Sequence, residues 1–526
     1  MIQPASRLRA PPLVLSTNAN YYLVALILLA GLAMRFYLAK IQPFWLDETF
    51  TWRALHNSYL DLISWQYDDM HPPVTYLIAK LMDQISHHNE LLMRTPFVLL
   101  SGINIFLAYR LGSSISGRLG GLIAAMLLSF SPFLVQLDFQ ARMYSPWVSS
   151  MFLIVVAYRR LYSGANGSII WRPVQFLWLG LALSLAFWVH FMSLYLWAAV
   201  GIALSWEFFL LFRRKGWSKE LANAAQCGLL LILIVGILCS PGVIKLLAIQ
   251  EATKPIDFSI QGLLKIWSTF LRGAWMPMAL GAVVTGLALF PVGERVLRNF
   301  LLLSLLSGSI FLVLSQNRHF IDARYLAPLT VPVVLGLAAL FSKINLFLLQ
   351  RWRWPGYALA VLVVIVGAQQ LTLTFKIIQL RKHSTYAGNN YTPHFATALQ
   401  NKIAPDDTIV FLPQYHRQVA VFQGWPADKL LKKYNRRVLR ENFDSPRSAL
   451  WIISIRDINS KRTSAGLRKH LEDRMRCIIS EQVPREFVSN LHELSSIALR
   501  FYGRSVTAYS LMDNGDLVQT QCMLTG

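Results

Sequence analysis

Charged residues are scarce in this sequence. They make up 15% of the 526 residues, while hydrophobic residues make up 55%. A soluble protein of this length usually carries about a quarter charged residues, because its surface must be held in water. The shortage excludes an ordinary soluble protein. A transmembrane β-barrel is also excluded, because it would show short segments of alternating polarity rather than long apolar ones.

Cysteine is rare as well. Four cysteines are too few for a disulfide framework. Cys227 and Cys239 lie in one apolar run, where a thiol is most simply a small core side chain. Cys477 and Cys522 lie in the polar C-terminal part, and they could pair if that part faces an oxidising compartment.

Nucleotide-binding loops are missing too. The sequence has neither a P-loop nor a G-x-G-x-x-G motif after a predicted strand. Acidic residues are outnumbered 27 to 50 by Lys and Arg, which on a soluble protein would suggest nucleic acid. Here the basic residues cluster between apolar runs, as in Arg159-Arg160 and Arg213-Arg214-Lys215. We interpret the clusters as cytoplasmic loops that follow the positive-inside rule, and we expect no nucleic-acid partner.

What the chain does have is apolar runs of about 20 residues, the length that crosses a bilayer core of about 30 Å. We predict a polytopic α-helical membrane protein with about eleven spans. With the N-terminus in the cytoplasm, every basic cluster falls inside, which predicts a multi-pass protein of the cytoplasmic (inner) membrane. The predicted spans are 20–40, 91–110, 118–136, 145–162, 174–190, 192–212, 222–244, 264–291, 297–315, 324–341 and 355–375.

The composition changes after Arg381. An odd number of spans sends this C-terminal part outside, and its β-like runs "DDTIVFL", "ALWIISI" and "SVTAYSL" alternate with helical candidates near 394–402 and 463–476. We predict an extracytoplasmic α/β domain at 381–526, after a membrane domain at 1–380. The membrane domain includes an outward loop, 41–90, where "VTYLIAKLMDQI" has the apolar spacing of a helix lying at the interface.

That loop opens with "QPFWLDETFTWRA", which contains the first two acidic residues of the chain, Asp47 and Glu48. Ionisable residues beside a span tend to be functional, and apolar surroundings make a carboxylate a better general base. The alternative is a helix start, with Asp47 as N-cap and Glu48 in the first turn. The pair alone does not separate the two interpretations.

Three further outward stretches supply cations and a histidine. In "DDMHPPVTY" the prolines place His71 in an extended break where it could face a ligand, with Asp68 or Asp69 beside it; a solvated turn is the alternative. Arginines suit bidentate contact with phosphate, although single ones at span ends also reach toward headgroups. The stretches "DFQARMYSPW" and "QNRHFIDARYLAP" contain the candidates Arg142, Tyr144, Arg318, His319, Arg324 and Tyr325.

Together these groups predict an outward site where a base activates an acceptor hydroxyl and cations stabilise a leaving phosphate. A lipid-linked phosphate donor fits the missing nucleotide motifs. A transporter or flippase of lipid-linked sugars is the alternative, but it needs polar groups at mid-membrane depth, whereas these lie at span ends. An inactive relative acting as a binding subunit is a third interpretation.

Several stretches resemble the GT-C membrane glycosyltransferases, in the branch of protein O-mannosyltransferases and bacterial aminoarabinose transferases. The resemblance covers most of residues 20–340. The stretches, in the order of the family, are "FWLDETFTWRA", "HPPVTYLIAKL", "LLMRTPFVLLSGINIFLAYRLG", "SPFLVQLDFQARMYSPW", "WVHFMSLYLWA" and "ARYLAPLTVP".

The resemblance implies inverting transfer of a sugar from a polyprenyl-phosphate donor to a hydroxyl of a protein, lipid or glycan. It implies that Asp47 is the catalytic base and that Glu48 contacts the acceptor or a metal. His71 falls where the aminoarabinose transferases look to have a lysine. The resemblance leaves open whether a divalent metal is used; Glu48 and His319 are the candidate ligands. It implies donor or phosphate contacts at Arg142, Tyr144, Arg324 and Tyr325.

Overall fold

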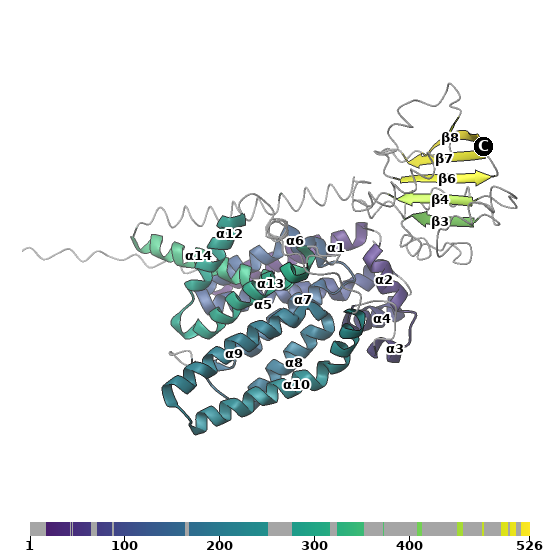
Figure 1. Ribbon diagram of the computed structural model, residues 1–526. Helices are drawn as coiled ribbons and strands as arrows, with labels where there is room; N and C mark the ends of the chain where they lie inside the picture. The colour runs from purple at the N-terminus through teal and green to yellow at the C-terminus, as the bar shows by residue number, and fades with distance from the viewer. Residues whose placement is uncertain are drawn as a thin grey trace, which may run out of the picture. The chain divides into compact units, whose positions relative to one another are not determined.

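The computed structural model describes residues 17–42, 44, 46–64, 71–86, 89–163, 168–250, 276–315, 323–351, 372, 408–412, 450–455, 476–477, 496–502, 505–511 and 517–525. The chain divides into two compact units. Figure 1 draws the helices and strands of the chain with their labels. A helical unit combines residues 1–39 with 57–376, and a second unit combines residues 40–56 with 377–526.

The helical unit is built from α-helices joined by short 3-10 turns and one small hairpin, β1–β2. Its elements, with α1 running on to Ile41, are α1 (Thr17–Ile41), α3 (Tyr59–Ile63), α4 (Val74–Ser86), α5 (Glu90–Ser129), α6 (Pro132–Leu137), α7 (Tyr144–Arg159), β1 (Tyr162–Ser163), β2 (Ser168–Ile169), α8 (Pro173–Val189), η1 (Phe191–Ser193), α9 (Leu194–Lys215), α10 (Lys219–Gln250), α12 (Met276–Ala288), η2 (Val292–Glu294), α13 (Arg295–Ser315), η3 (Ala323–Leu329) and α14 (Thr330–Arg351).

Local sequence sets several of these boundaries. Ser58 and Asp61 form a reciprocal capping box at the start of α3. Asn89 accepts a hydrogen bond from the Leu92 backbone and begins α5. Pro173 stands in the first turn of α8, where its missing N–H costs nothing. Gly216, with φ of 57°, ends α9 in a conformation that favours glycine.

Within the described residues, five helical segments are long and apolar enough to cross a membrane. They are Asn20–Ile41, Glu90–Ser129, Phe191–Lys215, Lys219–Leu247 and Ala323–Leu348, and the shorter Pro173–Val189 is also apolar. The chain is therefore a multi-pass membrane protein. The predicted span at 355–375 lies outside the described residues apart from Thr372, so the number eleven stays a prediction.

Helix α5 is broken at Gly117, whose φ of 77° and ψ of 177° are not helical. A Cβ added to Gly112 would lie 3.1 Å from the Cα of Gly121, nine positions further on. Such residues would be more than 13 Å apart in a straight helix, at about 1.5 Å per residue. The chain therefore folds back on itself at Gly117, in the interval between the predicted spans 91–110 and 118–136.

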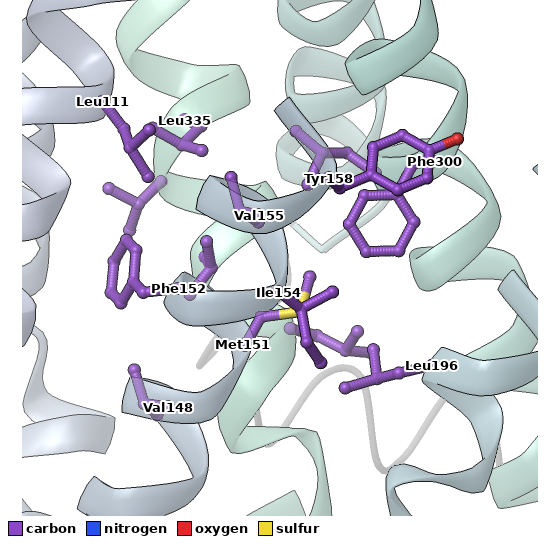
Figure 2. Close-up of a cluster of buried hydrophobic side chains, with 14 of the residues drawn as sticks. Leu111, Val148, Met151, Phe152, Ile154, Val155, Tyr158, Leu196, Phe300 and Leu335 are labelled. Carbon is purple, nitrogen blue, oxygen red and sulfur yellow. The ribbon is translucent and has the colours of Figure 1, made fainter. Parts of the chain in front are cut away.

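Helix α7 lies at the centre of the helical core. It packs against α5, α8, α13, α14 and η3. Its residues Val148, Met151, Phe152, Val155 and Tyr158 are fully buried among side chains from these neighbours (Figure 2). Those neighbours contribute Leu111 of α5, Phe300 of α13 and Leu335 of α14, and Leu196 of α9 belongs to the same cluster. Most side chains of α7 are buried, although Leu153 is exposed, so the helix is a rigid support for the residues at its two ends.

Helix α4 confirms the helix predicted from "VTYLIAKLMDQI". Tyr76 and Ala79 are fully buried, whereas Leu81 and Ile85 are exposed. The exposed apolar side chains fit a helix at the membrane interface, and that location remains a prediction.

The second unit contains α2 (Leu46–Ala54) and a six-stranded sheet of order β3-β4-β6-β7-β8-β5. Among the strand pairs in the described residues, β3 and β4 are parallel and the others are antiparallel. The three predicted β-like runs are strands β3, β4 and β7. The predicted helices near 394–402 and 463–476 lie outside the described residues, so the α/β class and the boundary at 380 stay predictions. The strands are β3 (Thr408–Leu412), β4 (Leu450–Ile455), β5 (Arg476–Cys477), β6 (Ser496–Tyr502), β7 (Ser505–Leu511) and β8 (Leu517–Thr525).

Candidate active site

A histidine and an arginine from distant parts of the sequence meet at one end of the helical unit. Arg142 Nη2 lies 3.4 Å from His71 Nδ1, and Arg142 Nη1 lies 3.5 Å from the Tyr76 hydroxyl. His71 stands before Pro72, just ahead of α4, and Arg142 lies in the short link between α6 and α7. Arg142 is only 3% exposed. Both residues were predicted from the sequence, and the fold brings them together.

His190, which the sequence prediction missed, lies at the centre of this group. It ends α8 and is fully buried. Its ring stacks on Trp147, with ring centroids 4.1 Å apart and planes 8° apart. The rings of His71 and Tyr325 lie edge-on to it, at centroid distances of 5.6 and 5.5 Å.

The hydrogen bonds of His190 define its tautomer. Its Nδ1 accepts from the Met192 backbone N–H at 3.1 Å. A nitrogen that accepts carries no hydrogen, so the hydrogen of the neutral ring is on Nε2. Within the described part of the chain, Nε2 has no hydrogen-bond partner. A buried polar group without a hydrogen-bond partner costs about 1–3 kcal/mol of folding free energy, so its presence in a folded protein needs a physical reason.

Trp147 is itself held in place. Its indole Nε1–H donates to Ser193 Oγ at 2.7 Å, and the Ser193 hydroxyl donates to the Ala186 carbonyl at 2.7 Å. Trp147 is on α7 and Ser193 is in η1, so this chain of bonds ties the two sides of the group together. The stacking surface for His190 is therefore fixed before any ligand arrives.

Two more predicted residues form a pair close by. The Arg324 guanidinium lies over the Tyr144 ring, 6.0 Å from its centroid, a distance at which a cation and a ring attract weakly. Arg324 is adjacent in sequence to Tyr325, which contacts His190. Of the predicted residues, His71, Arg142 and Tyr325 thus gather around His190, with Tyr144 and Arg324 paired beside them.

A buried ion pair, which sequence analysis also missed, secures the link that carries Arg142. Arg35 of α1 donates to Asp138 Oδ2 from Nη2 at 2.9 Å and from Nε at 3.1 Å, and both side chains are almost fully buried. The same guanidinium donates to the Ser129 and Gly31 carbonyls at 2.9 and 3.1 Å. Burial raises the pKa of the Asp138 carboxyl, and the nearby Arg35 guanidinium acts in the opposite direction.

Asp47 and Glu48 belong to the second unit, in the first turn of α2. The helix begins at Leu46, so Asp47 is inside the first turn rather than at the N-cap position that the alternative interpretation gave it. Asp47 is partly buried and Glu48 is fully buried. The helix dipole stabilises an acidic side chain near a helix N-terminus even when that side chain is exposed. Stabilisation of α2 therefore does not by itself explain why Glu48 is buried.

Some predicted site residues lie outside the described residues, namely Asp68, Asp69, Arg318 and His319. Among the residues that are described, no three His, Cys, Asp or Glu side chains group together as metal ligands would. The candidate pair Glu48 and His319 includes one residue that is not described, so a metal at that pair stays a prediction.

A second set of ion pairs lies at the other end of α7. Arg159, the last residue of α7, bonds to Glu294 at 2.5 Å, and the Tyr162 hydroxyl also donates to Glu294. Arg295 pairs with Glu207 at 3.0 Å. The 16 residues of α7 span about 24 Å, which separates these pairs from the histidine group. Arg159 belongs to one of the basic clusters that we interpret as cytoplasmic loops.

Residues 70–244 match the family model described as dolichyl-phosphate-mannose-protein mannosyltransferase. This segment contains His71, Arg142 and His190. No curated protein sequence matches the chain.

Solved structures share the fold at low sequence identity. ArnT from Cupriavidus metallidurans in the apo state is 11% identical with a TM-score of 0.53, over 88% of this chain and 97% of ArnT. The same ArnT bound to undecaprenyl phosphate is 12% identical with a TM-score of 0.52, over 87% and 96%. The oligosaccharyltransferase AglB from Archaeoglobus fulgidus, in complex with an inhibitory peptide and a dolichol-phosphate, is 12% identical with a TM-score of 0.52, over 85% and 70%.

The fold is therefore that of the GT-C membrane glycosyltransferases. The resemblance to the mannosyltransferase and ArnT-like branch, first seen in the sequence, is confirmed.

Proposed function

We propose that this protein is a membrane glycosyltransferase that moves one sugar from a polyprenyl monophosphate to an acceptor hydroxyl. The observation that carries the proposal is the group of a partly buried His71 with the buried Arg142 and His190, which lies inside the segment matching the mannosyltransferase family model. Hydrogen-bond donors and a permanent cation, buried in a membrane bundle, are what a lipid-linked phosphate needs. The protein ArnT, which shares the fold, has been solved with undecaprenyl phosphate.

The reaction that fits these groups is a single displacement. The acceptor oxygen attacks the anomeric carbon, the bond from that carbon to the phosphate oxygen breaks, and its electron pair leaves with the phosphate. The acceptor's proton passes to a carboxylate, which we assign to Asp47. Attack from the face opposite the leaving group inverts the anomeric carbon. Glu48 is assigned to contact with the acceptor.

Arg142 and His71 are assigned to the leaving phosphate. Negative charge grows on that phosphate as the bond breaks, and a buried guanidinium stabilises it more strongly than an exposed one would. Tyr144, Arg324 and Tyr325 are assigned to the rest of the lipid-linked donor. We place the reaction on the outer face of the cytoplasmic membrane, because these residues lie at the end of α7 opposite to the basic clusters.

The test is sugar transfer by purified protein in lipid nanodiscs, with a panel of undecaprenyl-phosphate-linked sugars and a cell-envelope extract as acceptor. We expect Asp47→Asn to lower the rate about a hundredfold or more, which is the size of a general-base contribution. Asp61→Asn is the matched control, since Asp61 is a partly buried acid whose side chain caps α3. Full activity of Asp47→Asn would remove Asp47 as the base.

A further inference from the structure

His190 offers a hydrogen-bond donor that the fold itself does not use. It is fully buried, its Nδ1 is occupied by the Met192 N–H, and its Nε2–H has no partner within the described residues. The ring is held by the Trp147 stack, and Trp147 is fixed by Ser193. A buried polar group held in one orientation without a partner is typical of a ligand-binding site.

The neighbours of His190 indicate which kind of ligand it meets. The Arg142 guanidinium has only hydrogens to donate. His71 accepts from Arg142 through Nδ1, so its neutral ring also has a hydrogen on Nε2. A phosphate oxygen has several lone pairs and carries negative charge, so it can accept from several such groups at once. A sugar hydroxyl brings a hydrogen of its own, which this set of donors matches less well.

We propose that His190 is a further donor-binding residue, whose Nε2–H donates a hydrogen bond to a phosphate oxygen of the lipid-linked sugar donor, beside Arg142. This inference rests on the proposed function and deepens it. His190 adds a directed bond without adding charge, because the bond from Met192 to Nδ1 requires the neutral ring. Arg142 supplies the positive charge, and the hydrogen bond from His190 orients the phosphate.

The test compares binding of undecaprenyl phosphate and undecaprenol to the full-length protein in nanodiscs. His190→Phe keeps an aromatic ring on Trp147 but removes the donor. We expect this variant to bind undecaprenyl phosphate about tenfold or more weakly than the wild type, and to bind undecaprenol with unchanged affinity. His190→Gln is the matched variant, because its amide nitrogen can occupy the position of Nε2; we expect it to bind undecaprenyl phosphate within a few-fold of the wild type.

Thermal unfolding of each variant shows that it is folded. If His190→Phe does not fold, His190→Asn replaces it, because its shorter amide does not reach the Nε2 position and the same loss is expected. Wild-type affinity for undecaprenyl phosphate in whichever of these two variants is folded overturns the inference, and so does an equal loss of affinity for undecaprenyl phosphate and undecaprenol. If the wild type itself fails to prefer undecaprenyl phosphate over undecaprenol, the proposed function fails, which is a distinct result.

Discussion

Arg35 and Asp138 show how single residues prepare the site without entering it. Arg35 is a charged residue inside an apolar helix, and its guanidinium makes hydrogen bonds to Asp138 and to backbone carbonyls at the end of α5. Asp138 also ends α6, where its N–H donates to the Leu134 carbonyl. The pair therefore joins α1, α5 and α6 directly ahead of the link that carries Arg142.

Removing one member of this pair should destabilise the protein strongly. Arg35→Met leaves the Asp138 carboxylate buried without its cation, and such a break costs about 3–5 kcal/mol. The measurement is thermal unfolding in detergent. The double variant Arg35→Met with Asp138→Leu leaves no buried charge and should recover much of the loss. A wild-type unfolding midpoint in the single variant would show that the pair contributes little.

At this scale the sequence predicts individual residues better than their partners. His71 and Arg142 stand out because prolines and a polar loop interrupt apolar runs. His190 and Asp138 carry a similar signal, a lone ionisable group at the end of an apolar run, and Arg35 is a charge within one. Their importance comes from contacts between residues far apart in the sequence, such as Arg35 with Asp138, which is 103 positions away, and His190 with Tyr325. Periodicity contains no information about such pairs.

At the scale of elements, α12 and α14 cross at two glycines. A Cβ built on Gly286 would lie 1.8 Å from the carbonyl oxygen of Gly336, and one on Gly336 would lie 2.8 Å from the Val283 carbonyl oxygen. Both clashes are with backbone, which cannot turn aside as a side chain can. Small residues allow membrane helices to approach this closely, so the crossing depends on both glycines.

We therefore expect Gly286→Ala to push α12 and α14 apart and to destabilise the protein by about 1–3 kcal/mol, as overpacking does. Gly281→Ala is the control in the same helix, because a Cβ there meets nothing within 4 Å. Unfolding in a detergent series gives the comparison. Equal unfolding midpoints for the two variants would mean that α12 and α14 can move apart without loss of stability.

Hydrophobic length predicted the helices well, because the bilayer requires apolar segments of one size. The break at Gly117 lies where "RLGSSISGRLGG" interrupts the apolar run, and the predicted spans already left that interval open. The 3-10 turns η1 and η3 could not be predicted in this way. They lie at the ends of apolar runs, and both carry groups of the site, Ser193 and Tyr325.

At the scale of the whole molecule, α7 has polar groups at both ends. The histidine and arginine group is at its first residues, and Arg159 with Glu294 is at its last. If the positive-inside interpretation is right, these ends face opposite sides of the membrane.

Cysteine labelling on intact cells tests this orientation. In a background with all four cysteines replaced by alanine, we expect Leu60→Cys to react with a membrane-impermeant maleimide from outside. Trp217→Cys should react only after the cells are opened. Both parent side chains are highly exposed, 78% and 90%, so reactivity reports the side of the membrane rather than burial. The reverse pattern would invert the topology and place the site in the cytoplasm.

In the proposed reaction the sugar leaves its lipid carrier and becomes bound to the acceptor. The most direct measurement follows a labelled undecaprenyl-phosphate sugar in proteoliposomes that contain the purified protein and an acceptor extract. We predict that label becomes covalently attached to the acceptor while an equal amount of undecaprenyl phosphate is released, and that Asp47→Asn nearly abolishes both. Label that crosses the bilayer still bound to its lipid, with no release of undecaprenyl phosphate, would contradict the account and support a transporter.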